Sequence, residues 1–360
     1  MKSIENMPVR ANAVIKKLIE GLPMLLEGME IRRIEYPQRL NKDLRLDLIA
    51  EIQIGRSRRK LLFEIKTAGE PRFALMSIPI LENAHERIGN SYPVFASSYI
   101  SARSRKLLRE RNIGYIDLAG NAYLRFGEVL IDRTSLETRE REQRGVKQLT
   151  APKATRVLRA LLNRYETPQR ITDLAKTCSM SPGGVYWVAQ LLEKDGFAER
   201  DASKRVKLTK PGDLLEYWAK SWEMRKNNWT SHFSFEKTPE DLIRHVAEFG
   251  RKRRNRYALT LMAGASLVAP FVRFQDVWVY IEGNEDDWVE ALGLKPVSSG
   301  GNLMLIRPYD QGVFMDTQTI KNVTIVSNTQ LYVDLYNFAA RGREQAEFLR
   351  EQRIKFKEIE

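Results

Sequence analysis

The most restrictive feature of the sequence is a helix start near the middle of the chain, where Ser181 and Pro182 are followed by two glycines. Serine can cap a helix N-terminus, and proline is favoured at the first helical position. The pattern predicts an amphipathic helix that runs to about Lys194 and ends near Gly196. Its predicted buried stripe consists of Val185, Val188, Ala189 and Leu192.

The residues around this helix complete a compact pattern. Two helices are expected before it, over Lys153–Tyr165 and from Ile171, the second capped by Thr172. Two short strands, Phe197–Arg200 and Arg205–Leu208, are expected after it. The stretch ends on Leu208-Thr209-Lys210-Pro211-Gly212, and as a whole it resembles a winged helix-turn-helix.

The outward face of the third helix has side chains suited to a DNA major groove. Gln190 can bond an adenine edge, and Tyr186 or Trp187 can contact a thymine methyl group. Cations of the wing would reach phosphates. The residues expected to contact DNA are Ser181, Gly184, Tyr186, Trp187, Gln190, Lys194, Arg200, Lys204, Arg205 and Lys207. Winged helices also mediate protein contacts, in which case Trp187 would anchor a dimer or a neighbouring domain.

Charge supports an anionic partner. The chain has a formal net charge of +13, and the excess lies in residues 1–230, whereas residues 231–360 are slightly acidic. Nucleic acid is the first expectation and an acidic membrane surface the second. One cysteine and three histidines exclude an intramolecular disulfide and a cysteine-based zinc site, and disfavour a histidine-rich metal site. Without a signal peptide or a run long enough to span a membrane, the expected location is the cytoplasm and no membrane partner is expected.

The N-terminal part predicts a mixed α/β order. A helix is expected at residues 9–20 and strands at 29–36, 44–54 and 60–67. A helix at 75–88, a strand at 93–99, a helix at 101–111 and strands at 113–118 and 121–126 follow. Glu64 and Lys66 are two residues apart and therefore share one face of a strand, beside Asp47 on the preceding strand. Two carboxylates can hold Mg²⁺, and a neighbouring ammonium can polarise water or phosphate.

Asp47, Glu64 and Lys66, together with the helix-strand order, resemble the PD-(D/E)xK restriction-endonuclease-like family over residues 9–126. The resemblance implies catalytic Asp47, Glu64 and Lys66, with Asp47 and Glu64 as the Mg²⁺ ligands. It also implies a helix carboxylate, Glu20 or Glu27. Domains of this fold also serve as inactive scaffolds, so the site is catalytic only if the protein is a nuclease, and otherwise no cofactor is expected.

The C-terminal part predicts an α/β domain with helices at 214–222, 239–249, 257–269, 286–292, 330–338 and 342–354, and strands at 277–281, 303–306, 312–315 and 323–326. Three stretches, residues 257–265, 305–308 and 326–335 followed by 341–343, resemble the AbiEi-type antitoxin and transcriptional-regulator family of type IV toxin–antitoxin systems. With the winged helix, the resemblance covers residues 150–355. It implies double-stranded DNA as one partner and a nucleotidyltransferase toxin as another.

We therefore expect a mixed α/β chain of three domains: a nuclease-like domain at 1–145, a winged helix-turn-helix at 146–230 and an AbiEi-like domain at 231–360. A sequence-specific DNA-binding regulator, dimeric to match symmetric half-sites, is the favoured function. A Mg²⁺-dependent nuclease guided by the winged helix and a protein-interaction scaffold remain alternatives. Convergence of Asp47, Glu64 and Lys66 in an open cleft would favour the nuclease, and a buried ion pair of Glu64 or Lys66 would disfavour it.

Overall fold

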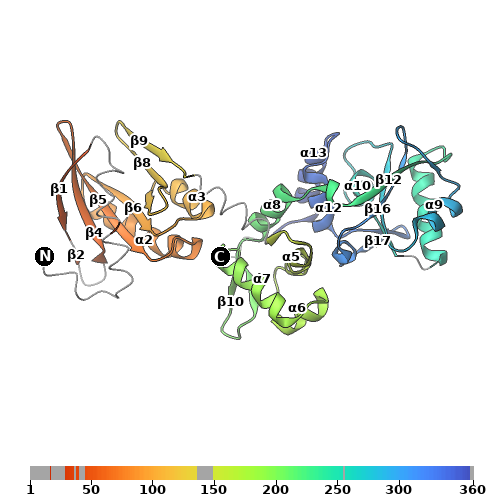
Figure 1. Ribbon diagram of the computed structural model, residues 1–360, viewed down its shortest axis with the longest axis horizontal. Helices are drawn as coiled ribbons and strands as arrows, with labels where there is room; N and C mark the ends of the chain where they lie inside the picture. The colour runs from red at the N-terminus through yellow and green to blue at the C-terminus, as the bar shows by residue number, and fades with distance from the viewer. Residues whose placement is uncertain are drawn as a thin grey trace. The chain divides into compact units, whose positions relative to one another are not determined.

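The computed structural model describes Lys17 and residues 29–35, 38–39, 45–135, 149–253 and 256–356. The chain divides into two compact units, which are considered separately (Figure 1). The first is formed by residues 1–145 and 194–196, and the second by residues 146–193 and 197–360. No described helix combines the length and the apolar composition needed to cross a bilayer.

The first unit is built on a seven-stranded mixed sheet of order β1-β4-β5-β6-β7-β8-β9. Neighbouring strands are parallel from β5 to β7 and antiparallel on either side. The elements are β1 (Glu30–Glu35), β2 (Gln38–Arg39), β3 (Arg45–Leu46), β4 (Leu48–Ile54), β5 (Ser57–Lys66), α2 (Pro71–Arg87), β6 (Ser91–Ser97), α3 (Ala102–Glu110), β7 (Gly114–Asp117), β8 (Ala122–Phe126) and β9 (Val129–Arg133).

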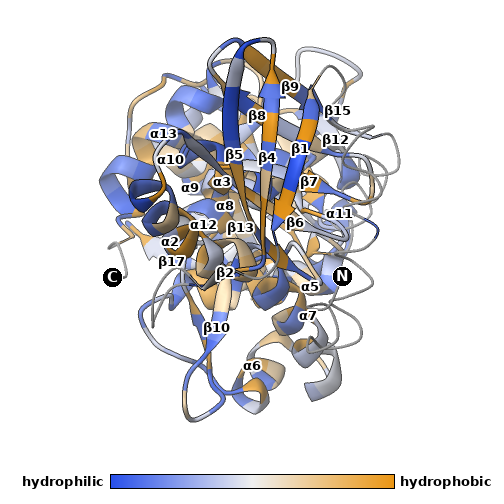
Figure 2. Cartoon of the chain, turned by 90° about the vertical axis from the view of Figure 1, so that its left-hand side faces the viewer, coloured by the Kyte–Doolittle hydropathy of each residue, from blue (hydrophilic) through white to orange (hydrophobic). Residues whose placement is uncertain are grey.

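Strand β5 shows why this sheet forms. Residues 57–60 are polar and mostly exposed and residues 61–63 are apolar and buried, a change in polarity that Figure 2 shows along the strand. Leu61 and Phe63 belong to the cluster on one face, and Leu62 belongs to the cluster that α2 covers. Because side chains alternate along a strand, Glu64 and Lys66 share the α2-covered face with Leu62.

The second unit begins with three helices and a two-stranded wing and continues into a seven-stranded sheet of order β15-β12-β16-β14-β13-β18-β17. One continuous apolar core runs from Leu149 to Ile354 through both parts. The first part contains α5 (Pro152–Asn163), α6 (Ile171–Cys178), α7 (Pro182–Lys194), β10 (Ala198–Arg200), β11 (Val206–Leu208) and α8 (Pro211–Ser221).

The remaining elements of the second unit build the larger sheet and the helices around it. They are η1 (Met224–Lys226), β12 (Asn228–Phe233), α9 (Pro239–Arg253), β13 (Tyr257–Thr260), α10 (Leu261–Val268), β14 (Val277–Ile281), α11 (Glu285–Ala291), β15 (Lys295–Pro296), β16 (Leu303–Arg307), η2 (Gln311–Phe314), β17 (Gln318–Ile320), β18 (Val323–Ile325), α12 (Asn328–Tyr336) and α13 (Gly342–Arg353).

Three local expectations are wrong. Residues 257–260 form β13 rather than the start of a helix, because their backbone pairs with β14 on one side and β18 on the other. The segment at 312–315 is largely a 3₁₀ turn whose start is capped by Asp310. Thr172 lies inside α6, whose N-cap is Arg170. Most of the helix expected at 9–20, together with Glu20 and Glu27, lies outside the described residues.

Candidate nucleic-acid interface

Helix α7 has a well-defined start and an open first turn. The Ser181 hydroxyl accepts a hydrogen bond from the Gly184 N–H at 3.2 Å, as a capping serine does. Pro182 and Gly183 are exposed, and a Cβ atom added to Gly183 would meet no atom within 4 Å. Backbone N–H groups at a helix start attract anions, so a phosphate can approach this turn closely.

The other faces of α7 are sharply divided. Val185, Val188, Ala189 and Leu192 are buried, as expected. Tyr186 and Trp187 keep 42% and 44% of their surfaces exposed, although large aromatic side chains are usually buried. Gln190 and Lys194 are exposed as well. The predicted DNA-facing residues of α7 therefore do not contribute to the apolar core.

The wing restrains part of this face. The Arg200 guanidinium lies 4.5 Å from the Tyr186 ring centre and donates from Nε to Glu193 at 2.5 Å. The Tyr186 hydroxyl in turn lies 3.4 Å from the Gln190 amide nitrogen. Arg200 therefore positions α7 side chains, and its own charge is already compensated by Glu193. Sequence spacing did not show this role, since Arg200 was expected to contact phosphate.

Asp201 organises the tip of the wing. One of its carboxylate oxygens accepts the N–H groups of Ser203 and Arg205, both at 2.9 Å, and the other accepts Arg205 Nε at 2.7 Å. These bonds hold the pKa of Asp201 below its usual value. Lys207 lies 3.9 Å from Glu199. Lys204 is exposed in the left-handed conformation (φ 60°), and among the described residues it has no ion-pair partner.

Helix α5 is fixed to the larger sheet domain by a buried arginine. Arg159 on α5 has no exposed surface, and its guanidinium lies 4.8 Å from the Trp218 ring centre. Its Nε donates to Gln330 of α12 at 2.7 Å and its Nη1 to Thr155 at 2.8 Å. Burial lowers the pKa of Arg159 from its ordinary value.

The same network continues to a buried carboxylate. Asp334 accepts hydrogen bonds from Thr260 at 2.6 Å, from Gln330 at 2.8 Å and from Tyr280 at 3.1 Å. Its partners are uncharged, and desolvation raises the pKa of Asp334 to about 6. Gln330 therefore lies between the charged groups of Arg159 and Asp334, and these hydrogen bonds link α5 to the sheet domain.

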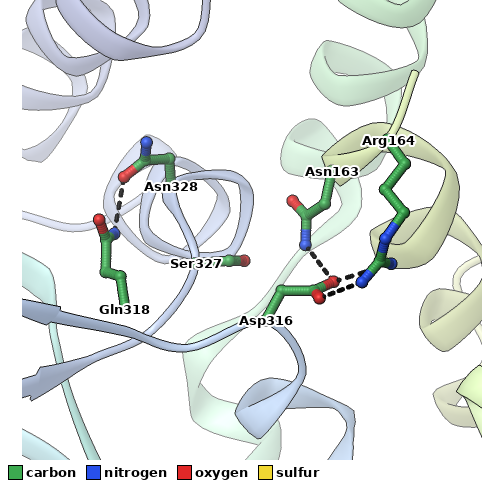
Figure 3. A pocket seen from close by; sticks show the side chains of 6 residues that line it. All are labelled: Asn163, Arg164, Asp316, Gln318, Ser327 and Asn328. Atoms are coloured by element: carbon green, nitrogen blue, oxygen red, sulfur yellow. Dashed lines mark hydrogen bonds and ion pairs between the residues drawn. The ribbon is translucent and has the colours of Figure 1, made fainter. Parts of the chain in front are cut away.

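A polar cleft of about 260 Å³ lies where α5 ends (Figure 3). Asp316 accepts hydrogen bonds from Asn163 at 2.9 Å and from Arg164 at 2.6 Å, so these two bonds also join the end of α5 to the sheet domain. On the other side, Gln318 donates to Asn328 at 2.7 Å. The polar groups that line the cleft therefore bond mainly to one another, and they hold the end of α5 against the sheet domain.

In the first unit, the three residues of the candidate nuclease site gather at the end of β5. Asp47 occupies the break between β3 and β4, and its Oδ2 accepts the Ile65 N–H at 2.8 Å. Glu64 is 4% exposed and forms an ion pair with the more accessible Lys66. Burial, and then the charge of Asp47, raise the pKa of Glu64, while Lys66 opposes this shift.

This arrangement satisfies part of the requirement for a metal site. Two repelling carboxylates stand beside a lysine, and a divalent cation would relieve their repulsion. However, Glu64 is also engaged in an ion pair with Lys66, which is buried on the glutamate side and partly exposed on the lysine side. No cluster of three or more His, Cys, Asp or Glu side chains able to hold a metal occurs within the described ranges.

Comparison with known proteins locates the resemblance in the second unit. Residues 207–355 match the family model described as "Transcriptional regulator, AbiEi antitoxin, Type IV TA system". No curated protein matches the chain. A solved structure, a repair endonuclease from Pyrococcus abyssi, is 16% identical with a TM-score of 0.25 over 32% of this chain. The matched region spans about half (49%) of that structure's chain.

The raised pKa of Asp334 predicts a pH-dependent stability. Between about pH 4 and 6 the folded chain retains a proton that the unfolded chain releases, so this contribution is full below pH 4 and is lost as the pH rises through 6. Relative to Asp334→Asn, which cannot ionise, the wild type should lose about 2–3 kcal/mol of unfolding free energy between pH 4 and 7.

Urea titrations followed by tryptophan fluorescence measure this difference. All six tryptophans lie in the second unit, so the signal reports that unit alone. A difference between the two proteins that does not change with pH would show that Asp334 is not a buried titrating group.

Proposed function

We propose that the protein is a sequence-specific transcriptional regulator of the AbiEi antitoxin type that binds double-stranded DNA through its winged helix. The observation that carries the proposal is the outward face of α7, where two large aromatic side chains, an amide and a lysine stay exposed. The family match over residues 207–355, which begins within the wing and extends through the sheet domain, supports it.

The proposal gives each part of the interface a separate task. The open first turn of α7, with Ser181 and Gly184, would bind a phosphate and set the depth of the helix in the groove. Gln190 would read an adenine edge, with Tyr186 and Trp187 against thymine methyl groups. Lys194, Lys204, Arg205 and Lys207 would contact phosphates, and Arg200 would hold Tyr186 in place.

The family resemblance extends the proposal to partners. A regulator of this type would act in the cytoplasm as a homodimer on symmetric half-sites. The sheet domain would bind a nucleotidyltransferase toxin. The first unit would serve as a non-catalytic platform for DNA or for the dimer.

A second candidate, a PD-(D/E)xK-type DNA nuclease, is favoured by the convergence of Asp47, Glu64 and Lys66 at the end of β5. Asp47 and Glu64 would hold Mg²⁺, which supplies a Lewis acid and an activated water when bound. Lys66 would stabilise charge on the phosphate, a task that requires it to leave its pair with Glu64.

Charge reversals in the wing test the proposed phosphate contacts. Lys204→Glu combined with Lys207→Glu should weaken binding to any double-stranded DNA by about 10- to 100-fold at low salt and reduce the slope of log K against log salt by about 2. Lys237→Glu, a matched reversal of an exposed lysine in the loop before α9, should change neither value. Unaltered binding by the double variant would exclude the wing as a contact surface. Fluorescence anisotropy over a salt series provides both values.

Gln190 tests base recognition. After a preferred site has been selected from random double-stranded DNA, Gln190→Ala should lose about 1–3 kcal/mol of discrimination at one base pair. Binding to unrelated DNA should stay unchanged, since the amide makes no predicted phosphate contact. An equal loss for the selected site and for unrelated DNA would show that Gln190 does not read a base. Competition binding with single-base-pair variants of the site measures the difference.

Lys66 separates the two candidate functions. The regulator proposal predicts no cutting of DNA by the wild type with Mg²⁺ or Mn²⁺, as judged on a denaturing gel. The nuclease candidate predicts cutting that Lys66→Ala abolishes. Lys60→Ala, on the same strand but at its exposed end, should retain that cutting. Metal-dependent cleavage with this pattern would replace the regulator by the nuclease.

A further inference from the structure

A second surface of interest lies in the sheet domain, outside the winged helix. Helices α9 and α10 and the turn between β17 and β18 enclose a pocket of about 300 Å³. Its floor is apolar, with Ile243, Ala247 and Val323 at most 6% exposed and Leu267 partly buried. The volume is enough to accept one or two apolar side chains.

The rim of this pocket is cationic, although residues 231–360 are slightly acidic overall. Arg244, Arg251 and Lys321 border it, and among the described lining residues Glu240 is the one that is acidic. Arg244 is paired with Asp241. For Arg251 and Lys321 no ion pair is found in the part of the chain that the structure describes, and both side chains are exposed. The rim therefore has positive charge that its own surroundings do not neutralise.

The wall that carries Lys321 has a defined shape. Ile320 pairs with Val323, so Lys321 and Asn322 are the two residues of a tight hairpin turn, with φ values of 49° and 65°. A turn with two left-handed residues matches the twist of a hairpin, and glycine or asparagine is usual there. A lysine in this conformation is uncommon. The turn places the charge of Lys321 at the edge of the pocket.

A second hollow of about 240 Å³ continues the surface beyond Arg251. The second hollow also includes Arg256, which is stacked 4.8 Å from the Phe314 ring centre and lies 4.0 Å from Glu282, so Arg251 and Lys321 carry the charge that has no ion-pair partner among the described residues. Arg251 lines both hollows, which together form a groove longer than a single side chain. This length suits an extended segment better than a compact small molecule.

We propose that this groove is a docking site for an acidic segment of a partner protein, in which an apolar side chain fills the pocket and flanking carboxylates meet Arg251 and Lys321. The proposal goes beyond DNA binding by the winged helix. Phosphates of a nucleic acid would pair with the rim, but they would leave the apolar floor at Ile243 and Val323 without a partner. A peptide with both features satisfies the floor and the rim together.

The test uses the full chain with labelled isoleucine, leucine and valine methyl groups, observed by NMR. The probe is a short synthetic peptide with one leucine flanked by glutamates. It should shift the methyl signals of Ile243, Leu267 and Val323 below about 1 mM, the range of weak peptide binding. A peptide with lysines in place of the glutamates, and one with alanine in place of the leucine, should each bind at least about tenfold more weakly.

Charge reversal on the protein supplies the matched comparison. Arg251→Glu combined with Lys321→Glu should weaken binding of the glutamate peptide by at least about tenfold. Lys252→Glu, an exposed neighbour on α9 outside the pocket lining, should change it by less than about twofold. The proposal is overturned if the glutamate peptide leaves these methyl signals unmoved, if all three peptides bind alike, or if double-stranded DNA shifts the same signals at lower concentration.

Discussion

The second unit depends on one buried cation. Arg159 has no exposed surface, and removing an arginine from water costs several kcal/mol. A neutral amide, a hydroxyl and the face of Trp218 offset part of that cost, while Nη2 has no hydrogen-bond partner among the described residues. These groups come from α5, α8 and α12, so Arg159 joins α5 to the sheet domain, beside the ion pairs of Arg156 with Asp310 and of Arg164 with Asp316. Helix α7, which packs in the same apolar core, therefore has a fixed orientation relative to residues 231–356.

In the first unit a buried charge is instead paired with an opposite charge, that of Lys66. The sheet of this unit places Asp47, Glu64 and Lys66 together because they lie around the same end of β5, but burial of Glu64 makes its ion pair with Lys66 a structural contact as well. The pair neutralises a carboxylate that would otherwise be buried alone. The same three residues could therefore persist in a platform without catalysis, which is why they alone do not establish a nuclease.

Local patterns predicted the elements whose signals are short-range. Ser181 caps α7 and Ser101 caps α3 as expected, because capping needs only three neighbouring residues. The strand at 257–260 was missed, since its small and apolar residues fit a helix equally well and only pairing with β14 and β18 decides. The roles of Arg159 and Arg200 were also beyond prediction. Arg159 meets Gln330, which lies far away in sequence, and nothing in the local pattern marks a buried arginine.

The central claim is that the winged helix is the surface that meets DNA, and hydrogen–deuterium exchange of the full chain tests it most directly. With a selected double-stranded site bound, amides at the start of α7 and along the wing, residues 181–208, should exchange more slowly. Strand β5 of the first unit should keep its exchange rate. Protection confined to β5 and its neighbours, with α7 and the wing unchanged, would contradict the account.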